Sequence, residues 1–285
     1  MTESAAAHGM RASAPIAGIR DAELGARLAT SATCDVHVLD DARVVKLYAA
    51  RARIEDIRRE TRIAALVHQA GLAAPWVDER LLRSVDSGRY GVVYGRVHGT
   101  AVSRMPMRHS FRLHALARRF AAEHLRLHAH PPPPGLPALR ERMAAKVDQL
   151  ATITADQRRR LHALLSSLAD GGVVCHGDFH HSNLMLRDDG SAVAIDWGDG
   201  AVGPVACDVA RSWVLARFGD RDGNPVRRCS HRLFGRTYLR AYLAASPIDR
   251  RELAGWILLN VAQRLSETAV PIERRWLSAH LERHL

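Results

Sequence analysis

The sequence predicts an α+β fold, with strands concentrated before about residue 97 and helices in most of the remainder. Alternating apolar residues over 34–39 and 43–48, joined by Asp40-Asp41, are typical of a β-hairpin. Further along the chain, apolar residues recur at helical spacing over 107–128 and in several later segments. With 285 residues, the chain is long enough to form two parts, each with its own core.

The other elements of the N-terminal part follow from short patterns with clear end signals. Residues 1–20 are expected to form a loosely ordered tail. A helix is expected over 50–70 because apolar residues recur there on one face, and Gly71 suits the position after its last turn. The remaining elements of this part are a short helix over 21–28 and a second hairpin formed by strands 81–85 and 90–97.

The C-terminal part is predicted to be mainly helical from residue 98 onward. In the helix over 107–128, Phe111 and Phe120 are expected to face inward, and four prolines at 131–134 follow its end. Further helices are expected over 139–150, 156–168, 209–217, 234–245, 251–267 and 272–284. Three short strands are expected at 173–174, 183–186 and 192–195.

The stretch from Val173 to Gly198 carries the candidate chemistry. Asp178 and Asn183 fall on the loop after the first short strand, and Asp196 comes just after the third. Strands joined by a loop and a hairpin bring the ends of these segments together. We therefore expect the three oxygen-bearing side chains to share one small volume.

This set of residues suits phosphoryl transfer. Mg²⁺ prefers oxygen ligands and takes only one or two carboxylates from a protein, with phosphates and water completing its coordination. Asn183 and Asp196 would supply these ligands, and Asp178 would accept the proton of an attacking hydroxyl group. In kinases a loop Asp, an Asn five residues later and an Asp-x-Gly turn divide these roles in the same order.

The net charge of +11 suggests nucleic-acid binding, but its distribution argues against that class. Residues 1–170 carry 26 basic and 17 acidic side chains, a net charge of +9, whereas residues 171–285 carry 15 and 13, a net charge of +2. The half with the candidate site is thus nearly neutral. We expect no nucleic-acid partner.

Cysteine usage and hydropathy favour a cytoplasmic protein. Cys34, Cys175, Cys207 and Cys229 have no zinc-finger spacing, so free thiols in a reducing compartment are the simplest interpretation. No apolar run approaches the roughly 18 residues of a membrane span, and the N-terminus lacks the pattern of a signal peptide. We therefore expect neither export nor a membrane partner.

The two ordered motifs resemble those of the aminoglycoside phosphotransferase and choline-kinase-like family of small-molecule kinases. They are the His-Gly-Asp string that ends at Asp178, followed by Asn183, and the Asp-Trp-Gly string that begins at Asp196. The resemblance implies a bilobal, protein-kinase-like fold. Its nucleotide-binding N-lobe would span residues 21–97, and its C-lobe, with the catalytic loop and acceptor-binding helices, would span 98–285.

The same resemblance implies a reaction and its cofactors. The γ-phosphoryl group of ATP, or possibly of GTP, would pass to a hydroxyl group of a small molecule, with Mg²⁺ bound to the phosphates. Aminoglycosides and other antibiotics, choline-like amines, homoserine and sugars remain open as acceptors. The acceptor would bind between the catalytic loop and the C-terminal helices. Candidates for lining that pocket are Asp199, Trp213, Trp256 and Glu267.

The N-lobe residues of the resemblance are candidates for nucleotide binding. Only two of the 41 basic residues are lysines, and Lys46 lies on the strand expected over 43–48, where a kinase places the lysine that binds the phosphates. Glu60 would orient Lys46, and Glu55 is the competing choice. Backbone groups of Gly95 and Val97 would bind the base, although an edge strand that ends at a glycine fits the same residues.

Three supporting side chains have expected roles of their own. His176 is expected to brace the catalytic loop by hydrogen bonding. Asp208 is expected to cap the helix over 209–217 and to brace the loop behind Asp196. The second lysine, Lys146, is expected on a helix surface.

One departure from the family pattern keeps other functions open. Residues 29–33, where these kinases carry a phosphate-binding loop, contain no glycine, so Ser31 and Thr33 would have to meet the phosphates. A nucleotide-binding pseudokinase that acts as an interaction module is therefore an alternative. A metal-dependent hydrolase is another, with Asp178 and Asp196 joined by histidines of the loop. Those histidines are His176, His180 and His181.

Overall fold

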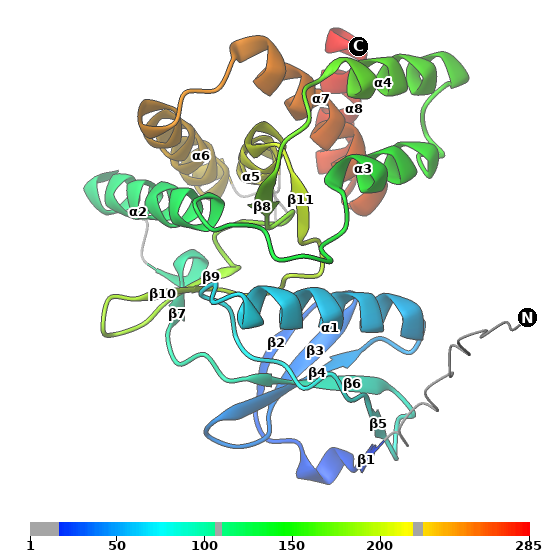
Figure 1. Ribbon diagram of the computed structural model, residues 1–285, viewed down its shortest axis with the longest axis vertical. Helices are drawn as coiled ribbons and strands as arrows, with labels where there is room; N and C mark the ends of the chain where they lie inside the picture. Colours follow the sequence, from blue (N-terminus) through cyan, green and yellow to red (C-terminus); the bar gives the residue numbers. More distant parts are fainter. Residues whose placement is uncertain (1–16, 106–109, 219–224) are drawn as a thin grey trace, which may run out of the picture. The chain divides into compact units, whose positions relative to one another are not determined.

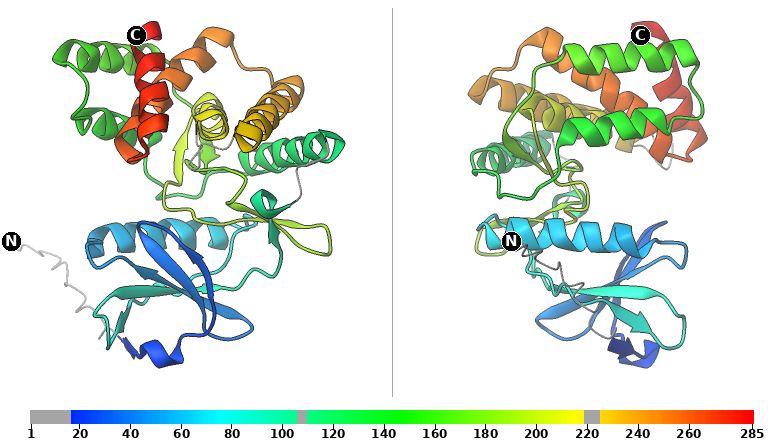
Figure 2. Two further views of the ribbon diagram at one scale, coloured as in Figure 1. Left: turned by 180° about the vertical axis from the view of Figure 1, so that it is seen from behind. Right: turned by 45° about the vertical axis from the view of Figure 1, so that its right-hand side comes forward.

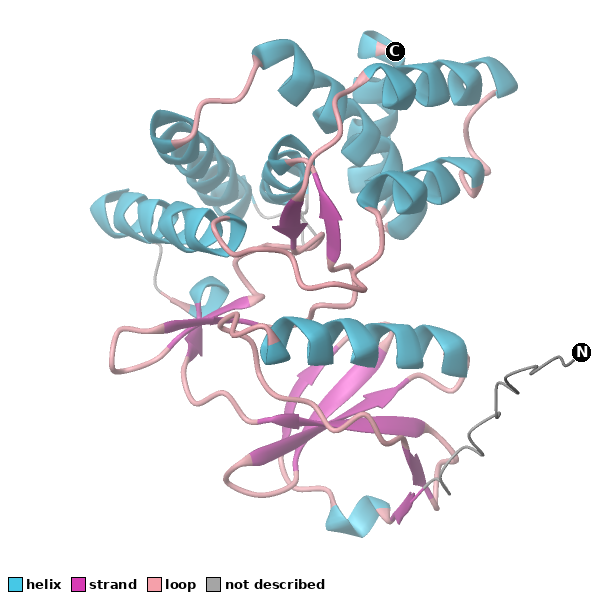
Figure 3. Cartoon of the chain, viewed as in Figure 1, coloured by secondary structure: helices cyan, strands magenta, loops and turns pink. Residues whose placement is uncertain are grey.

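The computed structural model describes residues 17–105, 110–218 and 225–285 (Figure 1). The chain divides into two compact units, an N-terminal unit of the residues up to Arg58 with Val77–Arg96, and a C-terminal unit of Arg59–Trp76 with Val97–Leu285. Strands predominate in the first unit and helices in the second (Figure 3). The α+β class is thus confirmed, but Arg59–Trp76, expected in the N-terminal part, belongs with the C-terminal unit.

A six-stranded sheet forms the N-terminal unit, in the order β1-β5-β6-β4-β3-β2. Its strands are β1 (Ala17–Ile19), β2 (Arg27–Thr30), β3 (Cys34–Val38), β4 (Arg43–Tyr48), β5 (Leu82–Ser84) and β6 (Tyr90–Gly95). Only β1 and β5 pair in parallel among these strands. Both predicted hairpins, β3–β4 and β5–β6, are confirmed.

The short helix expected over residues 21–28 is wrong. A 3₁₀ turn, η1, covers Asp21–Glu23, and the chain then enters β2, which pairs with β3. Directly after this turn, the Gly25 N–H donates to the Val38 carbonyl at 2.8 Å, so the helix does not continue into a second turn. Pairing with β3 satisfies the backbone groups that a longer helix would have paired internally.

The helix α1 (Ile54–Gln69) confirms the helix expected over 50–70. Near its start, Ile57 is only 1% exposed and packs with Tyr48, Leu81 and Val92 in the core of the N-terminal unit. At its end, Gly71 adopts φ +84°, and its N–H donates to a carbonyl of the last turn. Glycine reaches this left-handed conformation without the strain that a Cβ would bring.

Besides most of α1, the described residues of the C-terminal unit form seven helices and two small groups of strands. The helices are α2 (Ser110–His128), α3 (Leu139–Asp148), α4 (Ala155–Ser167), α5 (Val205–Phe218), α6 (Pro225–Ala245), α7 (Arg250–Glu267) and α8 (Pro271–His284). The strands are β7 (Thr100–Ala101), β8 (Val173–Cys175), β9 (Leu184–Leu186), β10 (Ala192–Ala194) and β11 (Ala201–Gly203), with a 3₁₀ turn, η2, at Val102–Arg104. These strands form a β10-β9-β7 sheet and a β11-β8 pair.

Helix α5 lies at the centre of this unit, packed against α6 and α7 (Figure 2). It also contacts β8, the strand that leads into the catalytic loop. Its buried side chains include polar ones, since Asp208 and Arg211 are 0% and 3% exposed. A buried polar group needs hydrogen-bond partners, so these two side chains tie α5 to its surroundings.

One expectation for α2 is wrong. Phe120 is buried and its ring lies 4.4 Å from that of Phe179, but Phe111 is 67% exposed. The buried face of α2 begins at Leu113. Two residues correspond to about 200° around a helix, which places Phe111 on the opposite face. Residues 107–109, also expected in this helix, lie outside the described residues.

Cys34, Cys175, Cys207 and Cys229 are all free thiols. Among the described residues, no helix combines the length and apolar character that a membrane crossing requires.

The packing of α1 on the sheet leads to a prediction for stability. Ile57→Ala removes a side chain that is fully enclosed by Tyr48, Leu81 and Val92, so it should lower the free energy of unfolding by about 3 kcal/mol. Urea denaturation measures the change. Arg58→Ala, on the exposed face of the same helix, should change it by less than about 0.5 kcal/mol. A loss below about 1 kcal/mol for Ile57→Ala would contradict this packing.

Candidate active site

The loop between β8 and β9 is held by one buried carboxylate, that of Asp208. Its Oδ2 accepts a hydrogen bond from the His176 N–H at 2.7 Å, and its Oδ1 accepts one from the Gly177 N–H at 2.8 Å. Helix α5 begins at Val205, so Asp208 lies inside the first turn and the predicted capping position is wrong. The two hydrogen bonds show that Asp208 braces the loop that leads to Asp178, whereas the loop behind Asp196 was expected.

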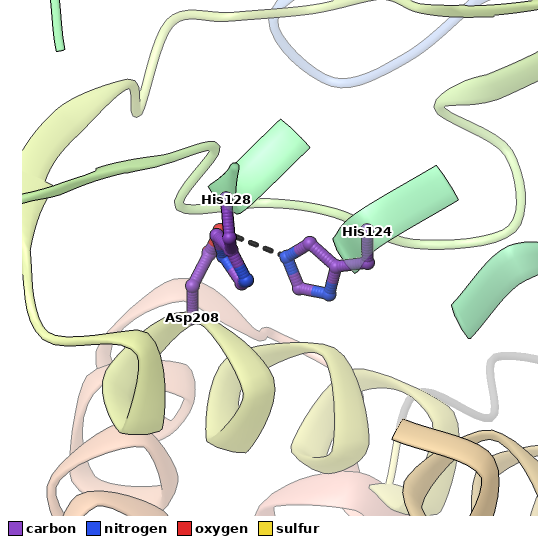
Figure 4. A group of neighbouring side chains, drawn as sticks. All are labelled: His124, His128 and Asp208. Atoms are coloured by element: carbon purple, nitrogen blue, oxygen red, sulfur yellow. Dashed lines mark hydrogen bonds and ion pairs between the residues drawn. The ribbon is translucent and has the colours of Figure 1, made fainter. Parts of the chain in front are cut away.

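Asp208 also accepts hydrogen bonds from two buried histidines of α2, His124 and His128 (Figure 4). Their Nε2 atoms lie 3.0 and 3.3 Å from Oδ2 of Asp208. Their Nδ1 atoms face the hydroxyl groups of Tyr238 and Tyr242, at 2.8 and 2.6 Å. With the Asp208 carboxylate as acceptor, each ring donates from Nε2, and its Nδ1 faces a hydroxyl group. These three side chains are spaced closely enough for a metal, but their donors and acceptors are used within the network.

The ring of His176 connects the two motifs. Its Nε2 donates to the Ile195 carbonyl at 3.0 Å, and its Nδ1 accepts from the Asp178 N–H at 3.3 Å. Burial lowers the pKa of His176, which keeps the ring neutral. The expected bracing role is confirmed. Because both ring nitrogens are engaged, His176 is unsuited to the metal-hydrolase alternative.

Gly177 occupies a conformation and a space that only glycine fits. Its φ is +76°, in the left-handed region. A Cβ at this position would overlap the backbone of Asp199 and lie 2.8 Å from its Cβ. The loop therefore passes close against the segment that follows the second motif, and this explains the glycine of the His-Gly-Asp string.

Asp178 lies in a strongly cationic environment. Its Oδ1 accepts from Nη2 of Arg211 at 3.0 Å, while its Oδ2 has longer contacts of 3.4 Å with Nε2 of His180 and Nδ2 of Asn183. Burial acts to raise the pKa of Asp178, but the His180 hydrogen bond and the charges of His180 and Arg211 outweigh it and hold the pKa below its ordinary value. The low pKa keeps this carboxylate ionised. Its side chain is still 26% exposed, so the carboxylate is also accessible.

The structure brings Asn183 and Asp196 close to Asp178. Asn183 donates from its side-chain Nδ2 to the backbone carbonyl of Asp178 at 3.0 Å. The backbone carbonyl of Asn183 accepts from the Ile195 N–H at 2.9 Å. Asp196 therefore follows directly on a residue bonded to Asn183. Asp196 adopts φ +65°, and among the described residues it is the only non-glycine with positive φ. Such strain is concentrated at functional sites.

Sequence analysis missed Arg211, which links this site to the C-terminal helices. Its Nη2 also donates to Oε2 of Glu267 at 2.8 Å, and Oε1 of Glu267 pairs with Lys146 at 3.1 Å. Lys146 and Arg142 of α3 both pair with Asp199. The expectation that Lys146 is a surface residue is wrong, because α3 packs against α7 and the lysine is directed at these carboxylates. The available signal was an arginine in the middle of a mainly apolar helix, three residues after Asp208.

The expected acceptor-lining residues have different surroundings in the structure. A small pocket lies among α3, α5 and α7, and Asp199 lines it. Trp256 is 0% exposed, so its candidate role is wrong; it faces the α5–α7 packing. Glu267 pairs with Arg211 and Lys146, and Trp213 is half-buried with its ring 6.2 Å from that of Phe218.

Of the four expected nucleotide residues in the N-terminal unit, three lie on or between its strands β2, β3 and β4. Lys46 is on β4, on the sheet face opposite Val45 and Leu47, with Nζ 5.4 Å from the ring centroid of Tyr48. Ser31 and Thr33 form the tight turn between β2 and β3, where the Ser31 hydroxyl accepts from the N–H groups of Thr33 and Cys34 at 3.2 and 3.1 Å. The Ser31 oxygen is thus used to hold the turn.

The other expected nucleotide residues lie at or beyond the unit boundary. Gly95 ends β6 in the N-terminal unit, and Val97 begins the main segment of the C-terminal unit. Glu60, in the C-terminal unit, lies against Gly198, where an added Cβ would be 3.1 Å from its Cγ. The competing Glu55 is 74% exposed and pairs with Arg53 at 3.7 Å. Glu60 is therefore the carboxylate beside the second motif.

Comparison with known proteins identifies similar sequences and folds. The family model described as the phosphotransferase enzyme family matches residues 6–256. A search of curated proteins finds no match.

Several solved structures share the fold. A thermostable mutant of aminoglycoside phosphotransferase APH(4)-Ia, in a ternary complex with AMP-PNP and hygromycin B, has a TM-score of 0.63 at 14% identity over 90% of this chain and 91% of that chain. Amicoumacin kinase hAmiN, in complex with AMP-PNP, Ca²⁺ and Ami, has a TM-score of 0.58 at 15% identity over 94% and 89%. The GDP complex of an aminoglycoside 2'-phosphotransferase-IIIa mutant has a TM-score of 0.53 at 16% identity over 92% and 91%. The fold is therefore kinase-like.

The buried histidine network predicts a pH dependence of stability. Burial, with the neighbouring His128, lowers the pKa of His124 from 6.5 to about 3. Below pH 6.5 the unfolded chain binds a proton at this residue that the folded chain does not bind, so stability falls as the pH is lowered. Between pH 7 and pH 5 this residue should reduce the free energy of unfolding by about 2 kcal/mol.

Urea denaturation of wild type and His124→Gln at the two pH values tests this dependence. The variant keeps an amide donor for Asp208 but does not titrate, so its free energy of unfolding should vary less with pH, by about 2 kcal/mol. Equal variation in wild type and His124→Gln would show that His124 is not the group responsible.

Proposed function

The chain belongs to the phosphotransferase enzyme family, and from this premise we propose that it transfers the γ-phosphoryl group of ATP or GTP to a hydroxyl group of a small molecule. The observation that carries the proposal is the arrangement around Asp178. An ionised, accessible carboxylate lies in a loop held by Asp208, Asn183 donates to its backbone carbonyl, and the residue before Asp196 is hydrogen-bonded to Asn183. This is the set of groups that phosphoryl transfer requires.

In this mechanism the acceptor hydroxyl group binds at Oδ2 of Asp178. The other oxygen, Oδ1, is committed to Arg211 at 3.0 Å, whereas Oδ2 has only the two contacts of 3.4 Å. Asp178 orients the hydroxyl group for in-line attack on the γ-phosphorus and takes its proton as the new P–O bond forms. The bond from the γ-phosphorus to the β–γ bridging oxygen breaks, and the nucleoside diphosphate leaves with that oxygen. Its low pKa suits a reaction in which positioning contributes more than basicity.

The donor groups of Asn183 and Asp196 fit a hard divalent cation. Nδ2 of Asn183 is used in hydrogen bonds to Asp178, which leaves its amide oxygen for a ligand role. An amide oxygen and a carboxylate match the preference of Mg²⁺. When bound, this ion would neutralise charge on the phosphates of the nucleotide.

We assign nucleotide binding to the remaining predicted residues. Lys46 would contact the α- and β-phosphates, and Glu60 would orient it. Backbone groups of Gly95 and Val97 would bind the base, with Ser31 and Thr33 near the phosphates. Complexes of the similar structures with AMP-PNP and with GDP support a nucleotide co-substrate and leave ATP and GTP as candidates.

The acceptor is proposed to be an antibiotic or another small hydroxyl compound in the cytoplasm. The similar structures were solved with hygromycin B and with Ami as well as with nucleotides. The four free thiols support a reducing compartment. An ADP-release screen with hygromycin B, streptomycin, choline, homoserine and simple sugars, followed by resistance profiles of a sensitive host, would identify the acceptor.

One observation favours a second candidate, a pseudokinase that binds nucleotide and acts as an interaction module. The Ser31 oxygen is used within its own turn, and the turn contains no glycine, so phosphate contacts there are restricted. A thermal shift with Mg-ATP but no ADP release with any acceptor would favour this candidate. ADP release that depends on an acceptor would exclude it.

Asp178→Ala should abolish transfer while leaving nucleotide binding intact. Loss of the group that orients and deprotonates the hydroxyl should lower kcat by about 10³-fold. Titration calorimetry with Mg-AMP-PNP should give a Kd within about threefold of wild type, since Asp178 is not a proposed metal ligand. Asp188→Ala, an exposed carboxylate of the β9–β10 hairpin, is the matched control and should retain full turnover. Turnover by Asp178→Ala at the wild-type rate would refute its assigned role.

Asp196→Ala should weaken binding of the metal-bound nucleotide. Removing one of the two proposed ligands should raise the Kd for Mg-AMP-PNP by tenfold or more. The Kd for AMP-PNP measured in EDTA should stay the same, because the metal contribution is absent there. An equal change with and without Mg²⁺ would show that Asp196 acts on the fold or on the nucleotide directly.

A further inference from the structure

We infer that Arg211 is a positioning residue of the reaction: it holds the Asp178 carboxylate so that Oδ2 faces the acceptor hydroxyl group, and Glu267 holds Arg211 in place. This inference rests on the proposed function for its chemistry. Its structural content, the dependence of the Asp178 position on Arg211, stands on the contacts alone.

Arg211 forms hydrogen bonds to both the backbone and the side chain of the loop. Its Nε donates to the Gly177 carbonyl at 3.2 Å, and its Nη2 donates to Oδ1 of Asp178 at 3.0 Å. One rigid, planar guanidinium thus fixes both the backbone before Asp178 and one of its carboxylate oxygens. Rotation of the Asp178 side chain about its Cα–Cβ bond would break the bond from Nη2 to Oδ1.

Helix α5 binds both backbone polar groups of Gly177, its N–H and its carbonyl. Asp208 accepts from the Gly177 N–H at 2.8 Å, and Arg211, three residues later on the same helix face, donates to the Gly177 carbonyl. Both ends of the residue before Asp178 are therefore anchored to one buried helix. Such double anchoring restricts the Asp178 side chain more than either bond could.

Stability alone accounts poorly for a buried arginine here. The Arg211 side chain is 4% exposed, and its Nη1 has no hydrogen-bond acceptor among the described residues. Its Nη2 is shared between Asp178 and Glu267. Burying a charge with an unsatisfied donor is unfavourable, and apolar replacements are often as stable. A role in positioning Asp178 accounts for the buried arginine better than a contribution to stability does.

Glu267 orients Arg211 from helix α7. Its Oε2 accepts from Nη2 of Arg211 at 2.8 Å, while its Oε1 accepts from Gln263 and pairs with Lys146, at 2.8 and 3.1 Å. The Glu267 carboxylate is thus fixed by three partners on α3, α5 and α7. The catalytic loop is connected through it to helices far along the chain.

Steady-state kinetics of Arg211→Lys, Arg211→Gln and Glu267→Gln test the inference. The acceptor is whichever of hygromycin B, streptomycin, choline and homoserine gives turnover, or water in a nucleotide-hydrolysis assay. Arg211→Gln should lower kcat about 100-fold, as expected when a reacting group is misplaced by about 1 Å. Arg211→Lys, which keeps the charge but loses the paired contacts, should lose about tenfold. The KM for Mg-ATP should stay within twofold in each.

The control is Arg158→Gln, which removes another partly buried arginine of the C-terminal unit. Arg158 donates to backbone carbonyls at the end of α3, including that of Leu150 at 2.7 Å. It should lower stability without lowering kcat. For the truncation Arg211→Ala, millimolar guanidinium should restore part of kcat, whereas the same addition should not affect Arg158→Gln.

Crystal structures of wild type and the Arg211 variants separate failure of this inference from failure of the proposed function. A displaced Asp178 carboxylate supports the inference even if no acceptor is turned over. An unmoved carboxylate, a kcat equal to wild type, or a change in KM alone overturns it. If Arg211→Gln does not fold, Arg211→Lys and Glu267→Gln decide by the same two measurements.

Discussion

The site depends on the hydrogen bonds between the buried Asp208 carboxylate and the backbone N–H groups of the catalytic loop. A charge without solvent is stable only when it is saturated with donors, and this carboxylate has the His176 and Gly177 amides and two histidines. Displacing the loop would leave that charge unsatisfied in the core. The free-energy cost of leaving the Asp208 charge unsatisfied therefore fixes the backbone before Asp178.

From this anchor, the remaining contacts determine which way each reactive group faces. The His176 ring joins the loop to the strand end before Asp196, and Arg211 fixes one oxygen of Asp178. Asn183 is oriented through its amide nitrogen, so its oxygen is left for a cation. Each group is restrained through atoms that the reaction does not use. The atoms that it would use remain available, which is the preorganisation expected of a phosphotransferase.

Residue identity and spacing were sufficient to predict much of this arrangement. The alternation in 34–48 and the helical stripe in 50–70 gave the correct elements, because burial of apolar faces dominates in both. The strands around Asp178 and Asn183 were also correct within a residue or two. The helix expected over 21–28 failed because pairing with a strand distant from it outweighed local propensity. The orientation of Phe111 failed because the buried face of α2 is set by its packing partner.

The sequence by itself determined the family, the α+β class and the identity of the three oxygen donors, since these are encoded in motifs whose spacing is local. Tertiary structure alone decided how those donors are held. Arg211, Glu267 and Lys146 come from three helices far apart in the chain, and no local pattern relates them. Their ion pairs form only when α3, α5 and α7 pack together and exclude water. A charge without water is unfavourable unless an opposite charge or a hydrogen-bond partner lies beside it.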